Sequence, residues 1–165
     1  MAMSAGDENV QKLEQLSEQL EQLESQRQAL ASEVEQLNAA QREITEAIEA
    51  IDALETGSTV QVPVGGGAFV RATVDDIEEV IVRLGGGFAA EQPQSDAVDS
   101  LADRRALLDD RVDEIESAIE DVEDDIEDLE AEARGLQAQL QQQYQQQVQQ
   151  MRGQGRPPGG EDGGS

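Results

Sequence analysis

Two kinds of residue cluster in this sequence could do chemistry, and neither makes a defined site. Acidic side chains crowd residues 120–128, and triple glycines stand at 65–67 and 85–87. The acids match no EF-hand spacing, and on a helix they would radiate outward rather than converge on a cation. The glycines lack the Lys-Ser/Thr of a phosphate-binding loop and open no helix, so turn chemistry explains them better. The sequence therefore predicts no metal, nucleotide or other cofactor.

The residue types that most often carry catalysis are missing. The chain of 165 residues has no histidine, cysteine or tryptophan, so catalysis would need carboxylates, serine or arginine. A carboxylate hydrolase would also need a pocket, which two helices in a rod do not make. With 37 acidic against 11 basic residues and a net charge of −26, the chain is poorly suited to neutralise phosphates, which argues against nucleic acid as a partner. We therefore expect a protein that is not an enzyme.

Nothing in the sequence points to a membrane. No apolar run approaches the ~20 residues of a membrane span, and the N-terminus has neither the basic region nor the apolar core of a signal peptide. We therefore expect no membrane partner and a cytoplasmic location. The 37 acidic residues with a single lysine, Lys12, are typical of a solvated surface and resemble the proteins of halophilic archaea.

Heptad repeats dominate the elements that must position any site. The first repeat predicts a coiled-coil helix over 7–56, with Asp7 as its N-cap and Gly57 as its stop. Arg27 and Gln41 interrupt its apolar seam, and we expect them to fix the register. The other positions of the seam are apolar: Leu13, Leu16, Leu20, Leu23, Leu30, Val34, Leu37, Ile44, Ile48 and Ile51.

A second repeat predicts a coiled-coil helix over 95–152, with Ser95 as its N-cap and Arg105 as the one break in its seam. Towards its end the spacing of apolar residues slips, which indicates a stutter. Residues 1–6 and the Gly/Pro-rich tail 153–165 are expected to be disordered.

Between the helices, residues 57–94 are rich in β-branched residues and glycine. The two triple glycines predict the turns of two β-hairpins, and Pro63 predicts an edge strand or a bulge. Two hairpins with little core leave open edges that seek partner strands. We therefore expect oligomerisation through the apolar residues of these strands: Val60, Val62, Val64, Phe69, Val70, Val80, Val82, Leu84 and Phe88.

The elements together predict a mainly α fold with a small β module: a long antiparallel coiled-coil hairpin with two β-hairpins at its bend. The second helix carries acids beside its seam and the first is mostly neutral there, so pairing the two within one chain avoids acid–acid contacts. Both chain ends then lie at the free end, where seam residues are only half covered.

Such a half-covered seam has two interpretations. It is either an ordinary core that frays at its end or an adaptable apolar grip on other chains, set in a glutamine-rich frame. The residues concerned come from both helices: Val10, Leu13, Leu16, Leu20, Leu136, Leu140, Tyr144, Val148 and Met151.

The β module resembles the alpha-class subunit of archaeal prefoldin. Residues 62–72 and 80–91 are similar to a Val-Pro-Leu-Gly-x-Gly-x-Phe segment and a Gly-x-Gly-Tyr/Phe-x-x-Glu segment of that family, which has a coiled coil on each side. The resemblance covers about residues 10–152, and two hairpins rather than one favour the alpha class. Phe88 stands where tyrosine is common, and the high acidity suggests a salt-adapted version.

The resemblance implies that two alpha and four beta subunits join their hairpins into an oligomeric double β-barrel carrying six coiled coils. The tips of the coiled coils would hold non-native polypeptides without ATP and transfer them to a group II chaperonin. The alternative from the residues alone is a coiled-coil scaffold or adaptor that binds folded partners by its strands.

Overall fold

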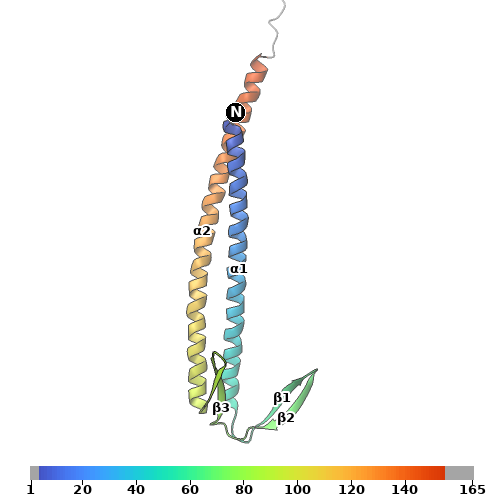
Figure 1. Cartoon of the computed structure of the whole chain (residues 1–165), viewed down its shortest axis with the longest axis vertical. Helices are drawn as coiled ribbons and strands as arrows, with labels where there is room; N and C mark the ends of the chain where they lie inside the picture. Colours follow the sequence, from blue (N-terminus) through green and yellow to red (C-terminus); the bar gives the residue numbers. More distant parts are fainter. Residues whose placement is uncertain (1–3, 155–165) are drawn as a thin grey trace, which may run out of the picture. The chain divides into compact units, whose positions relative to one another are not determined.

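A computed structural model describes residues 4–154, in which two long helices flank four short strands. The chain divides into two compact units, Met1–Leu30 with Ala118–Ser165, called unit 1 here, and Ala31–Ser117, called unit 2. Figure 1 shows α1 and α2 side by side within each unit. In the sequence, the four strands lie between the two helices. The predicted mainly helical fold with two β-hairpins is confirmed. The elements in order are α1 (Ala5–Ala53), β1 (Thr59–Gly65), β2 (Ala68–Thr73), β3 (Val80–Gly85), β4 (Phe88–Gln92) and α2 (Gln94–Gln154).

The N-cap of α1 is Ser4, and the prediction of Asp7 is wrong. The Ser4 hydroxyl oxygen accepts a hydrogen bond from the backbone N–H of Asp7 at 3.3 Å and donates one to the Asp7 carboxylate at 3.0 Å. A serine in this place satisfies an N–H that has no partner inside the helix. Residues 5 and 6 are therefore helical rather than disordered, and residues 1–3 lie outside the described part of the chain.

A side chain from α2 closes the far end of α1. The helix ends at Ala53, three residues before the predicted end at 56. The Gln94 side-chain amide donates to the carbonyl oxygens of Ile51, at 2.6 Å, and Leu54, at 3.1 Å. The last carbonyls of a helix have no partner within it, so this amide satisfies two groups that would otherwise need water. Gly57, the predicted stop, instead turns the chain towards β1 with φ 88°.

The start of α2 also differs from the prediction. The carbonyl oxygen of Pro93 accepts a hydrogen bond from the N–H of Ala97 at 2.9 Å, so the helix begins at Gln94 and Ser95 lies inside its first turn. The helix continues to Gln154, so residues 153 and 154 of the tail predicted to be disordered (153–165) are helical, and residues 155–165 lie outside the described residues.

Each β-hairpin closes on two glycines with positive φ. These are residues 66–67, with φ of 59° and 80°, and residues 86–87, with φ of 61° and 82°. Positive φ at both central positions defines the type I′ turn, whose twist matches that of paired strands. The pairing of β1 with β2 shifts between Pro63 and Gly65, so a bulge lies next to the proline. The pairing of β3 with β4 shifts at the equivalent place, between Arg83 and Gly85, so the shift does not require the proline.

In unit 2 the β3–β4 hairpin packs against both helices. Val82 is only 5% exposed and packs with Ala97 and Leu101 of α2. Burying a valine or leucine side chain stabilises a fold by roughly 1.5–3 kcal/mol, so this small cluster fixes the hairpin on the helices. Five half-buried apolar residues surround it: Ile44, Ala47, Ile48, Ile51 and Val80.

The polar breaks in the two seams of unit 2, Gln41 and Arg105, each form a hydrogen bond with the other helix. Gln41 of α1 donates a hydrogen bond to the carboxylate of Asp109 on α2, and Arg105 of α2 donates to the Thr45 hydroxyl on α1 at 3.2 Å. Each hydrogen bond thus ties a seam position of one helix to a residue beside the seam of the other. The role of Gln41 in fixing the register stays a prediction.

Ion pairs join the helices of each unit along their exposed sides. In unit 1, Lys12 lies 3.3 Å from Glu132 of α2. In unit 2, Arg111 of α2 contacts Glu33 of α1 and Glu114 of its own helix. The hydrogen bonds that Arg111 donates to Glu114 and Glu33 raise its pKa above the ordinary value. Because the partners of these pairs are exposed, water and salt screen the charges, and the pairs contribute little to stability.

Removing the Gln94 amide should destabilise the chain. We expect Gln94→Ala to lower the free energy of unfolding by about 1–2 kcal/mol, because two partly buried carbonyls, of Ile51 and Leu54 at the end of α1, lose their donor. Urea unfolding of the full chain, at fixed protein and salt concentration, measures the change. Gln28→Ala, an exposed position inside α1, controls for the change of helix propensity. Equal unfolding free energies for the two variants would contradict the capping role.

Candidate functional site

Unit 1 carries an apolar stripe near the end of α2, called the overhang stripe here: Leu140, Tyr144, Val148 and Met151. Their spacing of four, four and three residues places them on one face of the helix. Tyr144 is 68% exposed and Met151 70%, while Leu140 and Val148 are half-buried. The stripe thus offers two large uncovered side chains next to two partly covered ones.

The stripe is uncovered because α2 runs past the start of α1. A methyl group on Gly6, in the first turn of α1, would lie 4.0 Å from the side-chain oxygen of Gln143. Figure 1 shows the orange to red end of α2 continuing beyond the first described residue of α1. Among residues 4–154, α1 therefore has nothing to cover the last turns of α2.

On α1 the predicted grip residues are less uniform than expected. Val10 is exposed, and Leu13 and Leu20 are half-buried. Leu16 is only 5% exposed and Leu136 of α2 only 8%, so both lie inside the seam. The expectation of half-covered side chains does not hold for these two, because at this level each helix still has the other as its partner.

The segment that carries the overhang stripe has no charged side chain before Arg152, which follows Met151. Residues 135–151 contain no acidic or basic side chain, although 29% of the whole chain is charged. Glutamine supplies most of the remaining positions, and its amide both donates and accepts hydrogen bonds. Tyrosine and methionine adapt to varied apolar partners. The segment can therefore contact polypeptide of many sequences without selecting a charge.

The β1–β2 hairpin is exposed on both of its faces. Val62 pairs across the strands with Val70, and Pro63 with Phe69, which places the two pairs on opposite faces. Phe69 is 61% exposed, and Val62, Val64 and Val70 are exposed as well. A single two-stranded hairpin is at best marginally stable in water, so these apolar faces favour partner strands.

The β3–β4 hairpin has only one free face. Val80 and Val82, which were predicted to oligomerise, point to the helices and belong to the core of unit 2. Phe88 and Leu84 are exposed, as is Ile81, a residue that the sequence analysis missed. Strand alternation puts Ile81 and Val82 on opposite faces, but the sequence does not say which face meets the helices.

Side chains of α2 hold the β3–β4 hairpin in place. The Arg104 guanidinium donates a hydrogen bond to the carbonyl oxygen of Arg83, and the Ser100 hydroxyl donates to the amide oxygen of Gln92 at 2.9 Å. The two hairpins therefore differ: one is fixed on the helices, and the other presents both faces.

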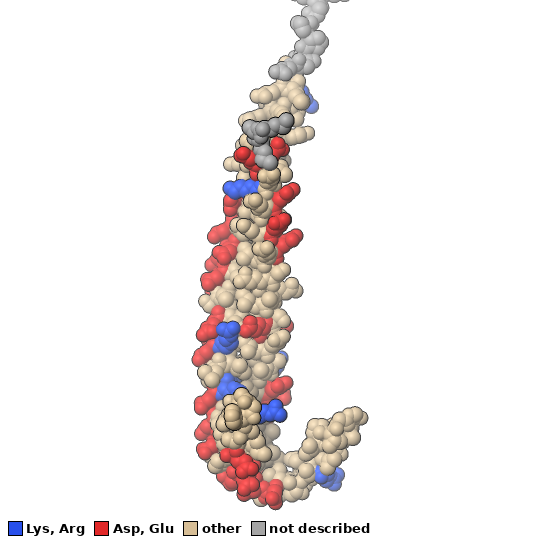
Figure 2. Space-filling view, in the orientation of Figure 1, with Lys and Arg blue, Asp and Glu red and all other residues tan. Residues whose placement is uncertain are grey.

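Charge divides the surface between helices and strands. Figure 2 shows acidic side chains along the helices on the face that it draws and almost none on the β1–β2 hairpin. The sequence of that hairpin, residues 59–73, contains no acid. The exposed strands can therefore approach another chain without bringing carboxylates together.

The described residues hold neither a metal cluster nor a bilayer-spanning helix. Within residues 4–154, no group of three or more acidic side chains is arranged to bind a metal ion. Across the same residues, no helix is both long and apolar enough to cross a membrane.

Comparisons with known proteins agree with this architecture. The family model for the prefoldin subunit matches residues 23–146. The chain is 44% identical over 104 residues to the prefoldin subunit alpha of Haloarcula marismortui, covering 63% of this chain and 68% of that one. It is 58% identical over 76 residues to the prefoldin subunit alpha of Halorubrum lacusprofundi, covering 46% and 50%. The chain thus matches about half the length of the Halorubrum relative.

Solved structures show the same fold. A filamentous PFD from Methanocaldococcus jannaschii superposes with a TM-score of 0.63 at 29% identity, over 70% of this chain and 98% of that one. The prefoldin beta subunit from Thermococcus strain KS-1 gives a TM-score of 0.52 at 16% identity, over 75% and 90%, and supports the fold alone.

Paired helices joined by two β-hairpins, with a family match across most of the chain, define the class: this chain belongs to the prefoldin subunit family. Within that family it is similar to alpha subunits of haloarchaea, which confirms the predicted resemblance to an archaeal alpha subunit from a halophile.

Loss of apolar side chains from the β1–β2 hairpin should weaken assembly. We expect Phe69→Ser with Val70→Ser to reduce the affinity for a haloarchaeal prefoldin beta subunit, used as the probe, at least about tenfold, because two exposed apolar side chains that an interface could bury are lost, each worth roughly 1.5–3 kcal/mol. Light scattering coupled to gel filtration measures the mass of the mixture. Thr59→Ser with Thr73→Ser, an exposed cross-strand pair of the same hairpin, is the matched control. A complex of unchanged mass at the same concentrations would contradict this role.

Proposed function

We propose that this chain is the alpha subunit of an ATP-independent holdase chaperone. Two copies would join four beta subunits through the β-hairpins, in the cytoplasm. The complex would hold non-native polypeptides at the tips of its coiled coils and pass them to a group II chaperonin. In this role the chain performs no catalysis and needs no cofactor.

The overhang stripe is the observation that carries this proposal. An unfolded chain presents apolar side chains and free backbone amides, and the stripe offers apolar surface inside a frame of neutral amides. Val10 of α1 adds an exposed side chain in the same unit. Because no charge lies between residues 135 and 151, the segment excludes few client sequences.

Each stripe alone would bind weakly. Burying one large apolar side chain contributes roughly 1.5–3 kcal/mol, and ordering a flexible client consumes much of that. Several stripes on one complex convert weak contacts into useful retention, because later contacts are intramolecular. Weak single contacts also let a client leave without an energy source.

The acidic helices suit the same role. A net charge of −26 keeps copies of the chain apart in dilute salt and discourages association along their sides. The large exposed apolar side chains of residues 4–154 lie mainly in the strands and the overhang stripe, where association is useful.

Replacing the two exposed side chains of the stripe should impair client holding. In a complex reconstituted with beta subunits, we expect Tyr144→Ser with Met151→Ser to require roughly two to five times more complex for equal suppression of aggregation, since the beta tips remain. Light scattering from a chemically denatured protein diluted into the assay measures suppression. Gln142→Ser with Gln149→Ser changes the opposite face of the same helix and serves as control.

Two results would count against the proposal. Unchanged suppression by the stripe variant would remove the binding role of the stripe. Absence of any suppression by the wild-type complex, with stable capture of one folded partner, would instead support an adaptor.

A further inference from the structure

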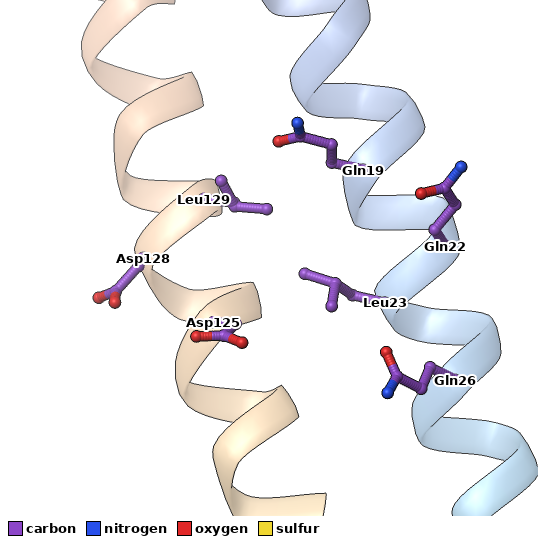
Figure 3. Close-up of a pocket in the computed structure, with 7 residues that line it drawn as sticks. All are labelled: Gln19, Gln22, Leu23, Gln26, Asp125, Asp128 and Leu129. Carbon is purple, nitrogen blue, oxygen red and sulfur yellow. The ribbon is translucent and has the colours of Figure 1, made fainter.

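Unit 1 has a groove between α1 and α2 that is separate from the overhang stripe. It has a volume of about 350 Å³. In Figure 3, Leu23 and Leu129 point into the space between the two helices and form its floor. The remaining lining is polar and comes from both helices: Gln19, Gln22, Gln26, Asp125 and Asp128.

The two banks of this groove differ in charge. On α1 a row of exposed glutamines repeats at spacings of four, three and four residues: Gln15, Gln19, Gln22 and Gln26. On α2 the row is acidic, with Asp121, Asp125 and Asp128 at spacings of four and three. Both rows follow the heptad period, so each forms a continuous edge along its helix.

The opposite flank of the helix pair is different. There Arg27 lies 2.8 Å from Glu24 of α1 and 3.9 Å from Glu123 of α2, so an internal base already pairs with acids of both helices. Within residues 4–154, Asp121, Asp125 and Asp128 take part in no ion pair, and residues 112–133 of α2 contain no base. The groove flank therefore carries acidic charge that the chain leaves unneutralised.

We propose that this groove docks a basic amphipathic helix of a client polypeptide. A third helix packs against two others at about 8–10 Å between axes, with its apolar row on the floor that Leu23 and Leu129 provide. Lysine or arginine on one side of that row meets Asp125 and Asp128, and polar residues on the other side meet the glutamine amides.

Charge selects this occupant over others. An acidic helix would bring further negative charge next to the unpaired carboxylates of α2, and a neutral helix would leave them unpaired. A basic helix neutralises them at heptad spacing. That the helix belongs to a client rests on the proposed function; the preference for a basic helix does not. Salt weakens the ion pairs, since the Debye length falls to ~3 Å at 1 M, and leaves the apolar floor in force.

Peptide binding to the full chain tests the groove. The probes are two fluorescent peptides of about 18 residues, enough for five helical turns, one with leucine and lysine in an amphipathic pattern and one with glutamate in place of lysine. Fluorescence anisotropy measures affinity in a potassium chloride series, at salt concentrations where circular dichroism shows each variant fully helical. We expect the wild-type chain to bind the lysine peptide, more weakly as salt rises, and to bind the glutamate peptide at least about tenfold less.

Charge reversal on α2 gives the matched comparison. We expect Asp125→Lys with Asp128→Lys to weaken the lysine peptide about tenfold and to strengthen the glutamate peptide. Glu127→Lys with Glu130→Lys makes the same change of net charge on the opposite flank and should leave both affinities within about twofold. Equal effects of the two variants would overturn the groove and show a response to net charge only.

The overhang stripe provides the remaining comparison. Loss of lysine-peptide binding in Tyr144→Ser with Met151→Ser, without loss in the Asp125 and Asp128 variant, would place the peptide on the stripe and overturn the proposal. Suppression of aggregation by the complex is measured in parallel. If the stripe variant suppresses aggregation less well, while the Asp125 and Asp128 variant binds both peptides as the wild-type chain does, the chaperone function stands and only the groove proposal is rejected.

Discussion

Packing of α1 against α2 along an apolar seam is the interaction on which the rest of this structure depends. The chain has two phenylalanines, one tyrosine and no tryptophan, so it cannot build a large compact core. It buries leucine, isoleucine and valine in successive layers instead, with Val112, Ile115, Val122 and Ile126 of α2 all covered. Each layer is worth a few kcal/mol, and their number compensates for the small size of each.

The charge pattern decides which helices can share that seam. Nine acids fall between residues 120 and 132 of α2, and two such helices would repel one another. In the structure the bases of α1 instead meet these acids, as Lys12 and Arg27 do with Glu132 and Glu123. Hydrogen bonds from Gln41 to Asp109 and from Arg105 to Thr45 add polar contacts between the two helices beside the apolar seam.

The periodic features were predictable from sequence, and the terminal ones were not. Heptad spacing predicts both helices because the 3.5-residue period is a property of many residues at once. The glycine turns were equally predictable, since only glycine adopts consecutive positive φ without strain. The ends of α1 depend instead on single contacts: Ser4 acts locally, and Gln94 acts from a position 40 residues beyond Leu54. No pattern in the residues around Leu54 could predict the contact with Gln94.

The site residues divide in the same way. The stripe of Leu140, Tyr144, Val148 and Met151 is visible in the sequence because it continues the seam. Its exposure depends on where α1 begins, which a heptad does not state. Burial of Leu16 and Leu136, and the inward direction of Val82, likewise follow from which surfaces meet. The groove beside Leu23 needed both helices in place, since its two banks lie about 100 residues apart in the chain.

Antiparallel pairing within one copy of the chain is the central claim, and a distance between two spin labels tests it most directly. Because the sequence has no cysteine, Glu14→Cys with Arg134→Cys introduces the only two labelling sites, both at exposed positions of unit 1. Pulsed electron–electron double resonance should give a distance of less than about 30 Å between the two labels, since the axes of paired helices lie about 8–10 Å apart. That separation should persist when labelled chains are diluted into an excess of unlabelled ones. A separation that vanishes on dilution would show that the helices pair between copies, and would contradict this account.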